Sequence, residues 1–547
     1  MFAAEAMAEM LCDYGLTHLF YVPVLSPLLM KSLIGRGVVP VVTHGEKAAV
    51  YMADGYARVS GRPGVCASQA IGSTNIAAGL REPFLARSPV LALTGGPEAA
   101  TRYKGLYQDV EDAPAFEPVT KYQAAVDKGD RAPDLLRQAY REMTTGVPRP
   151  AHLRLAGFFG IATFEEVSSP VAIEPWHRKV PGARLAADPT RVADAAERIA
   201  AAERPIMLIG GGIKRSRAEE AVLNLLATLS MPAVTTLNGM GAIGDDHPLY
   251  LGTAGDYGRD SANRALSEAD LVLVVGSSLG SMSTKNWTLV GSGATVVQID
   301  IDPGEIGRNY PGTVAAAGDA DMVLRQLTAR CTGSVPAKWQ ERVSELRAEW
   351  NAIVADVETS SAVPTRPERL LADLSSGLPA DAILVGDTGH IGAWAARHLR
   401  PRSDVTFVRA AGSLGWGLPA SLGAKCAAPQ RPVVCFTGDG GLYYHLAELE
   451  TACRYGLNIV VIVNNNVGMN QEMFLWDSDS VAQQKNWKFE DVDLVQVARG
   501  FGCHAQRVDD PDAIHRAVAE ALDAGRPALI DVRTDPAVAA PSSWGPA

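Results

Sequence analysis

An aspartate flanked by glycines, followed 27 residues later by the last of three consecutive asparagines, is the pattern in this chain best suited to hold a metal. The residues are Gly438, Asp439, Gly440, Asn464, Asn465 and Asn466. Glycines let the backbone close around a phosphate, the aspartate supplies an anionic oxygen, and one asparagine supplies a neutral oxygen. Mg²⁺ prefers such oxygen ligands, shared with substrate phosphates, over an all-protein cage. The pattern therefore predicts a divalent ion that binds a diphosphate.

One helix and one strand fit between the aspartate and the asparagines. Apolar residues recur at helical spacing over 446–453, Gly456 can end this helix, and residues 458–463 form a short apolar strand. Another apolar strand, over residues 433–437, leads into the glycines. Because a strand–loop–helix–strand unit returns its second loop beside the first, we expect both loops at the carboxyl edge of one parallel sheet.

This combination resembles the signature of the thiamine diphosphate (ThDP) enzymes of the acetolactate synthase, benzaldehyde lyase and 2-oxoacid decarboxylase superfamily. The resemblance implies that Mg²⁺ is bound by Asp439, the Asn466 side chain and the Gly468 carbonyl. It also implies cofactor contacts for further residues of these loops, namely Gly438, Gly440, Gly441, Asn466, Gly468 and Met469.

Glu46 is the principal catalytic candidate. It follows a strand over residues 38–42 and opens a helix that we expect to run through Tyr56. A lone glutamate in a first helical turn is usually there because the helix dipole favours it. The run from His44 to Val65, however, resembles the superfamily segment whose glutamate contacts the aminopyrimidine of ThDP. A carboxyl group in a dry pocket can keep a proton on the pyrimidine ring, because desolvation raises its pKa.

Two further loops resemble cofactor-binding segments of the superfamily. In the glycine-rich run 412–419, Leu414 matches the bulky apolar residue beneath the thiazolium ring, where it would bring the two rings of ThDP together. Gly412 and Ser413 precede it and are expected to contact the cofactor. The loop after the strand 382–385 contains Gly389, His390 and Ile391, which by resemblance contact the diphosphate and the pyrimidine.

The substrate candidates are polar residues in three loops. Gln108 resembles the active-site glutamine of acetolactate synthases and benzaldehyde lyase, and could bind a substrate carbonyl without changing charge. Gly72 and Ser73 match a loop near the pyrimidine and substrate, and Gln471 follows the predicted metal loop. Departures from the family pattern include the segment 468–472, which lacks the usual Gln-Trp of acetolactate synthases. Pyruvate is therefore not assured as the substrate.

The elements that position these residues predict an α/β protein. Short β-branched runs alternate with helical patterns along all 547 residues, which favours parallel sheets covered by helices. A chain of this length suggests about three domains. We expect three doubly wound parallel-sheet domains: a pyrimidine-binding domain at 1–167, a middle domain at 190–331, and a diphosphate- and Mg²⁺-binding domain at 368–547. The stretches 168–189 and 332–367 are interpreted as linkers, the second with a helical segment.

Composition excludes several other classes. The net charge of −11, without a basic run, argues against nucleic-acid binding. Seven cysteines without a CxxC pair predict neither a disulfide framework nor a metal cluster, and fit a reducing cytoplasm. The first ten residues lack a basic n-region, and no apolar run approaches the roughly 18 residues of a membrane span. We therefore expect a cytoplasmic protein that binds neither nucleic acid nor membrane.

The middle domain has one candidate phosphate cradle. Gly210, Gly211 and Gly212 follow the strand 205–209, and some members of the superfamily carry FAD or a nucleotide here. A lone glycine triplet is weak evidence. The flavin-associated Arg-Phe pattern after the strand 271–275 is replaced by residues 276–280, Gly-Ser-Ser-Leu-Gly. FAD is therefore considered but not favoured.

Together these features predict a ThDP- and Mg²⁺-dependent enzyme that cleaves or forms C–C bonds next to a carbonyl. The leading hypothesis is a decarboxylating carboligase of the acetolactate synthase kind, acting on a 2-oxo acid or 2-hydroxy ketone. One alternative is an aldehyde or 2-hydroxyacyl-CoA lyase that does not decarboxylate, and another is a catalytically silent structural or regulatory relative. The resemblance implies a homodimer or homotetramer with active sites at the subunit interface.

Overall fold

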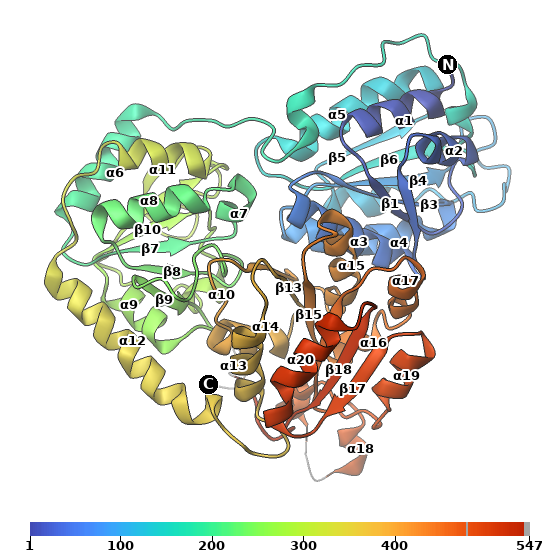
Figure 1. Ribbon diagram of the computed structural model, residues 1–547. Helices are drawn as coiled ribbons and strands as arrows, with labels where there is room; N and C mark the ends of the chain where they lie inside the picture. The colour runs from blue at the N-terminus through green and yellow to red at the C-terminus, as the bar shows by residue number, and fades with distance from the viewer. Residues whose placement is uncertain (477–479, 541–547) are drawn as a thin grey trace.

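The described residues fold around three separate six-stranded sheets, each of them entirely parallel. A computed structural model describes residues 1–476 and 480–540, and Figure 1 shows the three sheets covered by helices. The expectation of three α/β units with parallel sheets is confirmed. None of the helices in the described part of the chain is both long enough and apolar enough to cross a membrane.

The N-terminal sheet has the strand order β2-β1-β3-β4-β6-β5. Its strands are β1 (His18–Tyr21), β2 (Val39–Val42), β3 (Gly64–Ser68), β4 (Val90–Gly96), β5 (Tyr122–Val126) and β6 (Ala151–Ala156). Its helices are α1 (Ala3–Asp13), α2 (Pro27–Gly35), α3 (Glu46–Ser60), α4 (Ser73–Leu85) and α5 (Ala132–Thr144). Residues 64–68 and 90–96 are buried throughout, as expected for central strands covered on both faces.

The C-terminal sheet, β14-β13-β15-β16-β18-β17, repeats the strand order of the N-terminal sheet. Its strands are β13 (Ile383–Gly386), β14 (Thr406–Arg409), β15 (Val433–Gly438), β16 (Val460–Asn465), β17 (His504–Val508) and β18 (Ala528–Arg533). Its helices are α13 (Pro367–Gly377), α14 (His390–His398), α15 (Gly417–Ala427), α16 (Asp439–Tyr443), α17 (Glu448–Arg454), α18 (Val481–Gln484), α19 (Leu494–Gly500) and α20 (Ile514–Asp523).

The middle sheet has a different order, β12-β11-β10-β7-β8-β9. Its strands are β7 (Pro205–Ile209), β8 (Ala233–Thr235), β9 (Tyr250–Thr253), β10 (Leu271–Val275), β11 (Thr295–Asp300) and β12 (Val314–Ala317). Its helices are α6 (Pro189–Ala201), α7 (Gly212–Ser216), α8 (Glu219–Leu229), α9 (Asp260–Glu268), α10 (Ser281–Thr284) and α11 (Ala320–Thr328). The chain order reverses between β7 and β10, where parallel sheets commonly form a crevice at their carboxyl edge.

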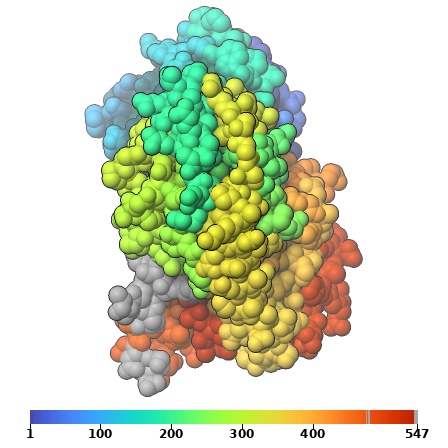
Figure 2. Space-filling model, turned by 90° about the vertical axis from the view of Figure 1, so that its left-hand side faces the viewer, coloured from blue at the N-terminus to red at the C-terminus, as the bar shows by residue number. Residues whose placement is uncertain are grey.

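The expected linker 332–367 contains a packed helix of 22 residues, α12 (Ala337–Glu358). Trp339, Val343 and Leu346 recur at helical spacing and join the core of the middle domain. Figure 2 shows α12 as a continuous yellow band down the face formed by the middle domain. The segment is therefore attached along much of its length to the domain that precedes it.

The N-terminal and C-terminal domains share one hydrophobic core, which is centred on the contact between α3 and α15. Figure 1 shows these two helices side by side where the blue and orange parts of the chain meet. A side chain at Gly55 would lie 2.1 Å from the Ala420 carbonyl oxygen, and one at Gly423 would lie 1.9 Å from the Met52 carbonyl oxygen. The two glycines therefore allow the helix backbones to touch.

Element boundaries depart from the sequence expectation at two places near the predicted site. Helix α3 continues past Tyr56 to Ser60 and ends at Gly61, whose φ of 70° suits glycine. Strand β16 extends through Asn465 instead of ending at residue 463, because the first two asparagines pair in register with β18. Two of the three asparagines thus belong to the sheet, and only Asn466 lies beyond it.

Candidate active site

The carboxyl edge of the C-terminal sheet brings the loop after β15 into contact with the loop after β16. Asp439 is the first residue of α16, and its Oδ2 accepts a hydrogen bond of 2.8 Å from the Gly468 N–H. Asp439 is 3% exposed. Gly440 and Met469 continue this contact, since a side chain at Gly440 would meet the Met469 side chain at 3.4 Å. Two loops 29 residues apart therefore enclose one buried carboxyl group.

Electrostatically, Asp439 is a buried acid without a cationic partner. Burial raises its pKa to about 6, although the backbone N–H groups of Gly440 and Gly468 act against the shift. No Lys, Arg or His side chain of residues 1–476 and 480–540 forms an ion pair with it. A bound cation would compensate the desolvation of the ionised form, so the site fits the divalent ion expected from the sequence.

The three asparagines have different environments. Asn465 donates to Asp531 Oδ1 at 2.7 Å and accepts from the Val467 N–H at 3.1 Å, so its side chain is used to hold the loop. Asn464 has a buried Oδ1 without a hydrogen-bond partner among the described residues. Asn466, 8% exposed, is followed by Val467 with φ of 58°, a conformation that a β-branched residue rarely adopts. Such strain near a candidate site is typical of functional loops.

Within the described part of the chain, no three His, Cys, Asp or Glu side chains cluster as a metal-binding group. The expected ligand set depends on an amide and a backbone carbonyl as well as on Asp439. Such oxygen ligands suit Mg²⁺, which usually retains waters and takes few protein carboxylates. The buried residues Asp439, Asn466 and Gly468 are gathered at this edge and provide oxygens of this kind.

Asp387, directly after β13, was not predicted from the sequence. It is 1% exposed and accepts hydrogen bonds from the N–H groups of Gly415 and Gly417, at 3.1 and 3.3 Å, and from the Thr437 hydroxyl at 3.0 Å. Burial raises its pKa to about 6, against these donors. A polar residue at the carboxyl end of a central strand is a signal that could have identified Asp387.

The glycine-rich segment that carries Leu414 lies beside the metal loop. Gly415 has φ of 83°, and a side chain there would lie 2.4 Å from the Tyr444 Cβ, so only glycine fits. Leu414 itself is half-buried, whereas Gly412 is exposed. The sequence-predicted residues Gly412, Ser413 and Leu414 therefore form a loop held beneath α16 and adjacent to Asp387.

On the other side of β15, Gly389 precedes α14, and His390 and Ile391, which were predicted to lie in a loop, form the first turn of this helix. Ile391 approaches Gly438, where a side chain would meet it at 3.7 Å, and Gly389 has φ of 70°. Burial lowers the pKa of His390 to about 4, so its imidazole is uncharged at neutral pH. Gln471 Oε1 would lie 3.3 Å from a side chain at Gly389, and its amide nitrogen is 3.4 Å from the Tyr257 hydroxyl of the middle domain.

In the N-terminal domain, Glu46 opens α3 and is half-buried. Its Oε2 accepts a hydrogen bond of 3.1 Å from the Asn75 amide. A side chain at Gly72 would lie 2.5 Å from Glu46 Oε1, so this glycine leaves room for the carboxyl group. Ser73 donates its hydroxyl to the Ala70 carbonyl at 2.7 Å, and its side chain therefore serves the local helix.

Gln108 is attached to the same loop. It has φ of 61°, and its Oε1 accepts a hydrogen bond of 3.1 Å from the Ile71 N–H, next to Gly72. The structure thus brings Glu46, Gly72 and Gln108 to one side of the N-terminal domain. Among the described residues, the Glu46 carboxyl group hydrogen-bonds to Asn75 and faces Gly72, and no hydrogen bond joins it to Leu414 or Asp439. The predicted residues form two groups on two domains.

The turn before Glu46 contacts the C-terminal domain through α17, which the sequence did not reveal. The His44 N–H donates to Glu448 Oε1 at 3.0 Å, and His44 Nε2 lies 2.7 Å from Glu450 Oε2. The Val42 N–H donates to the Tyr455 hydroxyl at 2.9 Å. These residues lie more than 400 positions apart, so no local pattern could predict their contact.

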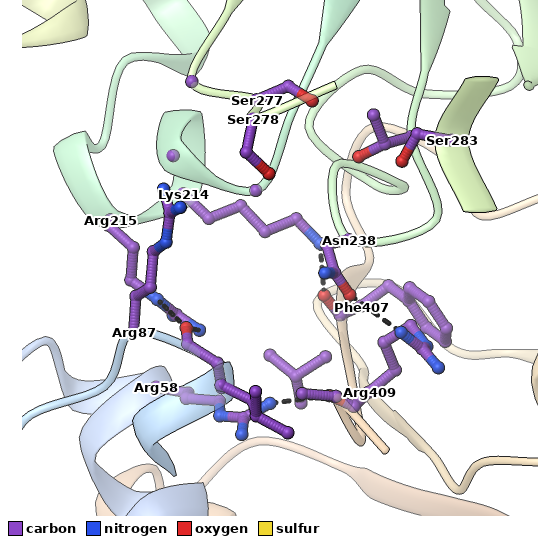
Figure 3. A pocket seen from close by; sticks show the side chains of 18 residues that line it. Arg58, Arg87, Lys214, Arg215, Asn238, Ser277, Ser278, Ser283, Phe407 and Arg409 are labelled. Atoms are coloured by element: carbon purple, nitrogen blue, oxygen red, sulfur yellow. Dashed lines mark hydrogen bonds between the residues drawn. The ribbon is translucent and has the colours of Figure 1, made fainter. Parts of the chain in front are cut away.

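A hollow lies where the three domains meet, at the carboxyl edge of the middle sheet. Its volume is about 180 Å³, and Figure 3 shows basic side chains around it. The basic residues are Arg58, Arg87, Lys214, Arg215 and Arg409. Lys214 donates to the Phe407 carbonyl at 2.7 Å, and Arg409 donates to Asn238 Oδ1 at 2.7 Å. Burial lowers the pKa of Lys214 to about 7 and that of Arg409 to about 10.

Comparison with known protein families gives three matches along the chain. Residues 1–116 match the N-terminal TPP binding domain of thiamine pyrophosphate enzymes, residues 192–327 the central domain, and residues 387–532 the C-terminal TPP binding domain. The two groups of candidate residues described above lie within the two TPP binding domains.

Individual proteins match over nearly the whole length. A probable acetolactate synthase large subunit of Methanocaldococcus jannaschii is 32% identical over 562 aligned residues, covering 99% of this chain and 93% of the relative. Acetolactate synthase isozyme 2 large subunit of Escherichia coli is 30% identical, covering 92% of this chain and 90% of the relative. A probable 2-ketoarginine decarboxylase of Pseudomonas aeruginosa is 32% identical, covering 97% of this chain and 94% of the relative.

Proposed function

Because this chain belongs to the thiamine pyrophosphate enzyme family, we propose that it is a ThDP- and Mg²⁺-dependent enzyme that cleaves or forms C–C bonds next to a carbonyl group. Its leading activity is decarboxylating carboligation of 2-oxo acids. The relatives named as acetolactate synthases and as a 2-ketoarginine decarboxylase support 2-oxo acids as the substrate class. The observation that carries the proposal is the buried carboxyl group of Asp439, which pairs with no Lys, Arg or His side chain of residues 1–476 and 480–540 and lies against the loop of Gly468.

The C-terminal residues would hold the diphosphate end of the cofactor. Asp439, the Asn466 amide and the Gly468 carbonyl would bind Mg²⁺. The surrounding backbone would contact the cofactor through Gly389, His390, Ile391, Gly412, Ser413, Gly438, Gly440, Gly441 and Met469. His390 would act as an uncharged contact because of its lowered pKa. Leu414 would press on the ring system and fix its bend, which is a proximity effect.

The N-terminal residues would act on the reactive end of the site. When bound, ThDP supplies a carbon nucleophile for the substrate carbonyl. Glu46 would hold a proton on the pyrimidine ring nitrogen, with its carboxyl group oriented by Asn75 and given room by Gly72. Gln108 would donate its amide to a substrate oxygen, and Gln471 would contact the substrate from the other domain. Ser73 would contribute through its backbone, since its hydroxyl is occupied.

Glu46→Gln tests the catalytic assignment, because glutamine keeps the shape of the side chain but cannot hold the exchanged proton in the same way. We expect CO₂ release from a panel of 2-oxo acids to fall at least about 100-fold, while Mg²⁺-dependent binding of ThDP in calorimetry is retained. Glu142→Gln, in the same domain and outside the site, is the control. Unchanged turnover in Glu46→Gln would refute the role of Glu46.

Product analysis tests the reaction class. Incubation with 2-oxo acids should give CO₂ and a ligated 2-hydroxy ketone or 2-hydroxy-3-oxo acid product. Cleavage of ketols or 2-hydroxyacyl-CoA thioesters without CO₂ release would instead identify a lyase. Wild-type protein that binds ThDP and Mg²⁺ but turns over none of these substrates would indicate a silent relative.

We further propose that the active site forms between subunits of a homodimer or homotetramer. The separation of the Glu46 group from the Leu414 and Asp439 group supports this, as does an apolar hollow of about 550 Å³ beside the Gln108 segment. The hollow is lined by Leu106, Phe158, Phe159, Ile161 and Phe164, of which Phe159 and Ile161 are 44% and 55% exposed. Mixing inactive Glu46→Gln subunits with inactive Asp439→Asn subunits should restore activity if each site takes one group from each subunit. Absence of recovery in exchanged dimers would contradict this arrangement.

For the middle domain we propose that flavin is not bound. The hollow of about 180 Å³ is smaller than the roughly 300–1,000 Å³ of pockets for organic ligands. Residues 276–280 also lack the flavin-associated Arg-Phe pattern. Purified protein should show no flavin absorbance and no thermal stabilisation by FAD. A flavin band that survives gel filtration would overturn this proposal.

A further inference from the structure

Glu82 is a fully buried carboxylate that reaches from the N-terminal domain into the loop carrying Leu414. It lies in α4, and its Oε2 accepts hydrogen bonds from the N–H groups of Gly412 and Ser413, at 3.0 and 2.9 Å. Its Oε1 accepts from the Ala411 N–H and from Arg58 Nη2. Three consecutive backbone N–H groups around one carboxylate form an anion-binding concavity, in which the anion is supplied here by a side chain.

Arg58 and the loop keep Glu82 ionised. Burial alone would raise the pKa of Glu82, but the Arg58 guanidinium and the N–H groups of Ala411 and Ser413 outweigh burial and hold it below its usual value. Charge-assisted hydrogen bonds of this kind are stronger than those between neutral groups. The loop is therefore bound to a charge that the N-terminal domain itself stabilises.

The same network holds the far end of the loop. The Trp416 indole N–H donates to Asp54 Oδ2 at 2.9 Å, and Asp54 pairs with Arg58. The Arg58 guanidinium lies 4.4 Å from the centre of the Trp416 ring. Helix α3, which begins with Glu46, thus also carries Asp54 and Arg58 into the loop of the C-terminal domain.

Leu414 lies between two sets of anchored residues. Glu82 binds the N–H groups of residues 411–413, and Asp387 binds those of Gly415 and Gly417. Each carboxylate comes from a different domain. The backbone of Leu414 is consequently fixed from both sides, and displacement of either carboxylate would move this side chain.

We propose that Glu82 is a positioning residue of the active site, which acts through residues 411–413 to place Leu414 against the cofactor. This inference rests on the proposed function. In this proposal the N-terminal domain carries Glu46 and also positions the Leu414 loop of the same chain. A displacement of about 1 Å in a positioned group can reduce the rate about 100-fold.

Glu82→Gln tests the proposal, because the glutamine amide has only one acceptor oxygen. In the wild type, the donors from Arg58 and residues 411–413 share the two carboxylate oxygens of Glu82. We expect ThDP and Mg²⁺ to bind within about threefold of wild type, because Asp439, Asn466 and Gly468, which would hold the ion and through it the diphosphate, are untouched. The kcat should fall about 10- to 100-fold with KM nearly unchanged. Exchange of the thiazolium C2 proton of bound ThDP in D₂O, followed by NMR after acid quench, should slow by a similar factor. Glu142→Gln is the matched control in the same domain.

Glu82→Asp keeps the charge beside Arg58 but shortens the reach to the loop, and so separates positioning from folding. We expect it to retain more stability than Glu82→Gln and to lose rate and C2 proton exchange similarly. Normal exchange and kcat in either folded variant would overturn the proposal, as would a loss of rate explained entirely by lost ThDP binding.

Hydrogen–deuterium exchange of the cofactor-free protein distinguishes failure of this inference from failure of the proposed function. Amides 411–413 should lose protection in Glu82→Gln whether or not ThDP is the cofactor. If wild-type protein does not bind ThDP with Mg²⁺, the proposed function fails. If it binds and the amide protection of 411–413 is unchanged in Glu82→Gln, the positioning role alone fails.

Discussion

The N-terminal and middle domains contact the C-terminal domain in very different ways. Helices α3 and α15 touch backbone to backbone within a shared apolar core, and the Arg58 side chain there, 3% exposed, is paired with two carboxylates. The middle domain contacts the C-terminal domain around the basic hollow of Figure 3, where Lys214 and Arg409 bind carbonyl and amide oxygens and form no ion pair among the described residues.

This difference shows which contact can position a reacting group. Apolar burial with fully paired charges gives one preferred arrangement, because any shift opens a cavity or leaves a buried charge unpaired. At the hollow, Lys214, Arg215 and Arg409 form no ion pair among the described residues, so small shifts there break no salt bridge of these three cations. The chain therefore attaches the candidate catalytic residues to the first kind of contact. Four predictions test the comparison.

Arg58→Met should have the largest effect. It leaves Asp54 and Glu82 buried without their shared cation, which typically reduces stability by about 3–5 kcal/mol. Urea unfolding of the cofactor-free protein measures the change. The corresponding variant at the basic hollow is Arg215→Met. It removes a cation that has no carboxylate partner within ion-pair distance in the described part of the chain, and it should change stability far less. Equal losses in the two variants would contradict the comparison.

Gly423→Ala tests the backbone contact of the shared core. Its methyl group would lie 1.9 Å from the Met52 carbonyl oxygen, so α3 and α15 must separate, and we expect a loss of about 3 kcal/mol. The matched variant at the hollow is Gly211→Ala, whose methyl group would lie 3.1 Å from Asn238 Cβ and should cost less than about 1 kcal/mol. Thermal unfolding of both variants is the measurement. A tolerated Gly423→Ala would show that the helices are not tightly packed.

Asp439→Asn extends the comparison to a buried carboxyl group that has no cationic partner among the described residues, because the variant removes its charge. The raised pKa of about 6 means that ionisation opposes folding: stability is greatest below about pH 4 and is lost as pH rises through 6, by about 3 kcal/mol. Without Mg²⁺ and ThDP, the variant should therefore be more stable than wild type at pH 8 and equal to it at pH 4. Mg²⁺ with ThDP should reverse the order at pH 8, because only wild type binds the ion well. A variant that still gains stability from Mg²⁺ with ThDP would place the metal elsewhere.

Lys214→Met should have the smallest effect and a distinctive pH dependence. Burial lowers the pKa of Lys214 to about 7, so the folded state favours the neutral amine and stability falls as pH drops from about 10 toward 7. Methionine does not titrate, and the stability difference should move in favour of the variant by about 2 kcal/mol between pH 9 and pH 7. Melting temperatures across this range measure it. A constant difference would mean that the carbonyls of Met240 and Phe407 keep Lys214 charged throughout.

Much of the architecture follows from local sequence. The β-branched runs at 205–209 and 271–275 predicted two strands at their observed boundaries, because buried parallel strands need continuous apolar residues. The spacing from Asp439 to Asn466 predicted that their loops meet, because a right-handed crossover returns the chain to the same sheet edge. The interpretation of 332–367 as a linker included a helical segment but did not foresee that α12 packs on the middle domain, since the partners of its apolar residues lie elsewhere in the chain.

By itself, the sequence determined the three parallel sheets, the meeting of the loops after β15 and β16, and the family, because these follow from apolar periodicity and from recognisable motifs. Only the tertiary structure decided which carboxylates hold the Leu414 loop. Asp387 lies 28 residues from Gly415 and Glu82 lies 329 residues from Ala411. Neither contact produces a repeating pattern, because a buried side chain finds its partner through the packing of whole domains and not through the residues next to it in the chain.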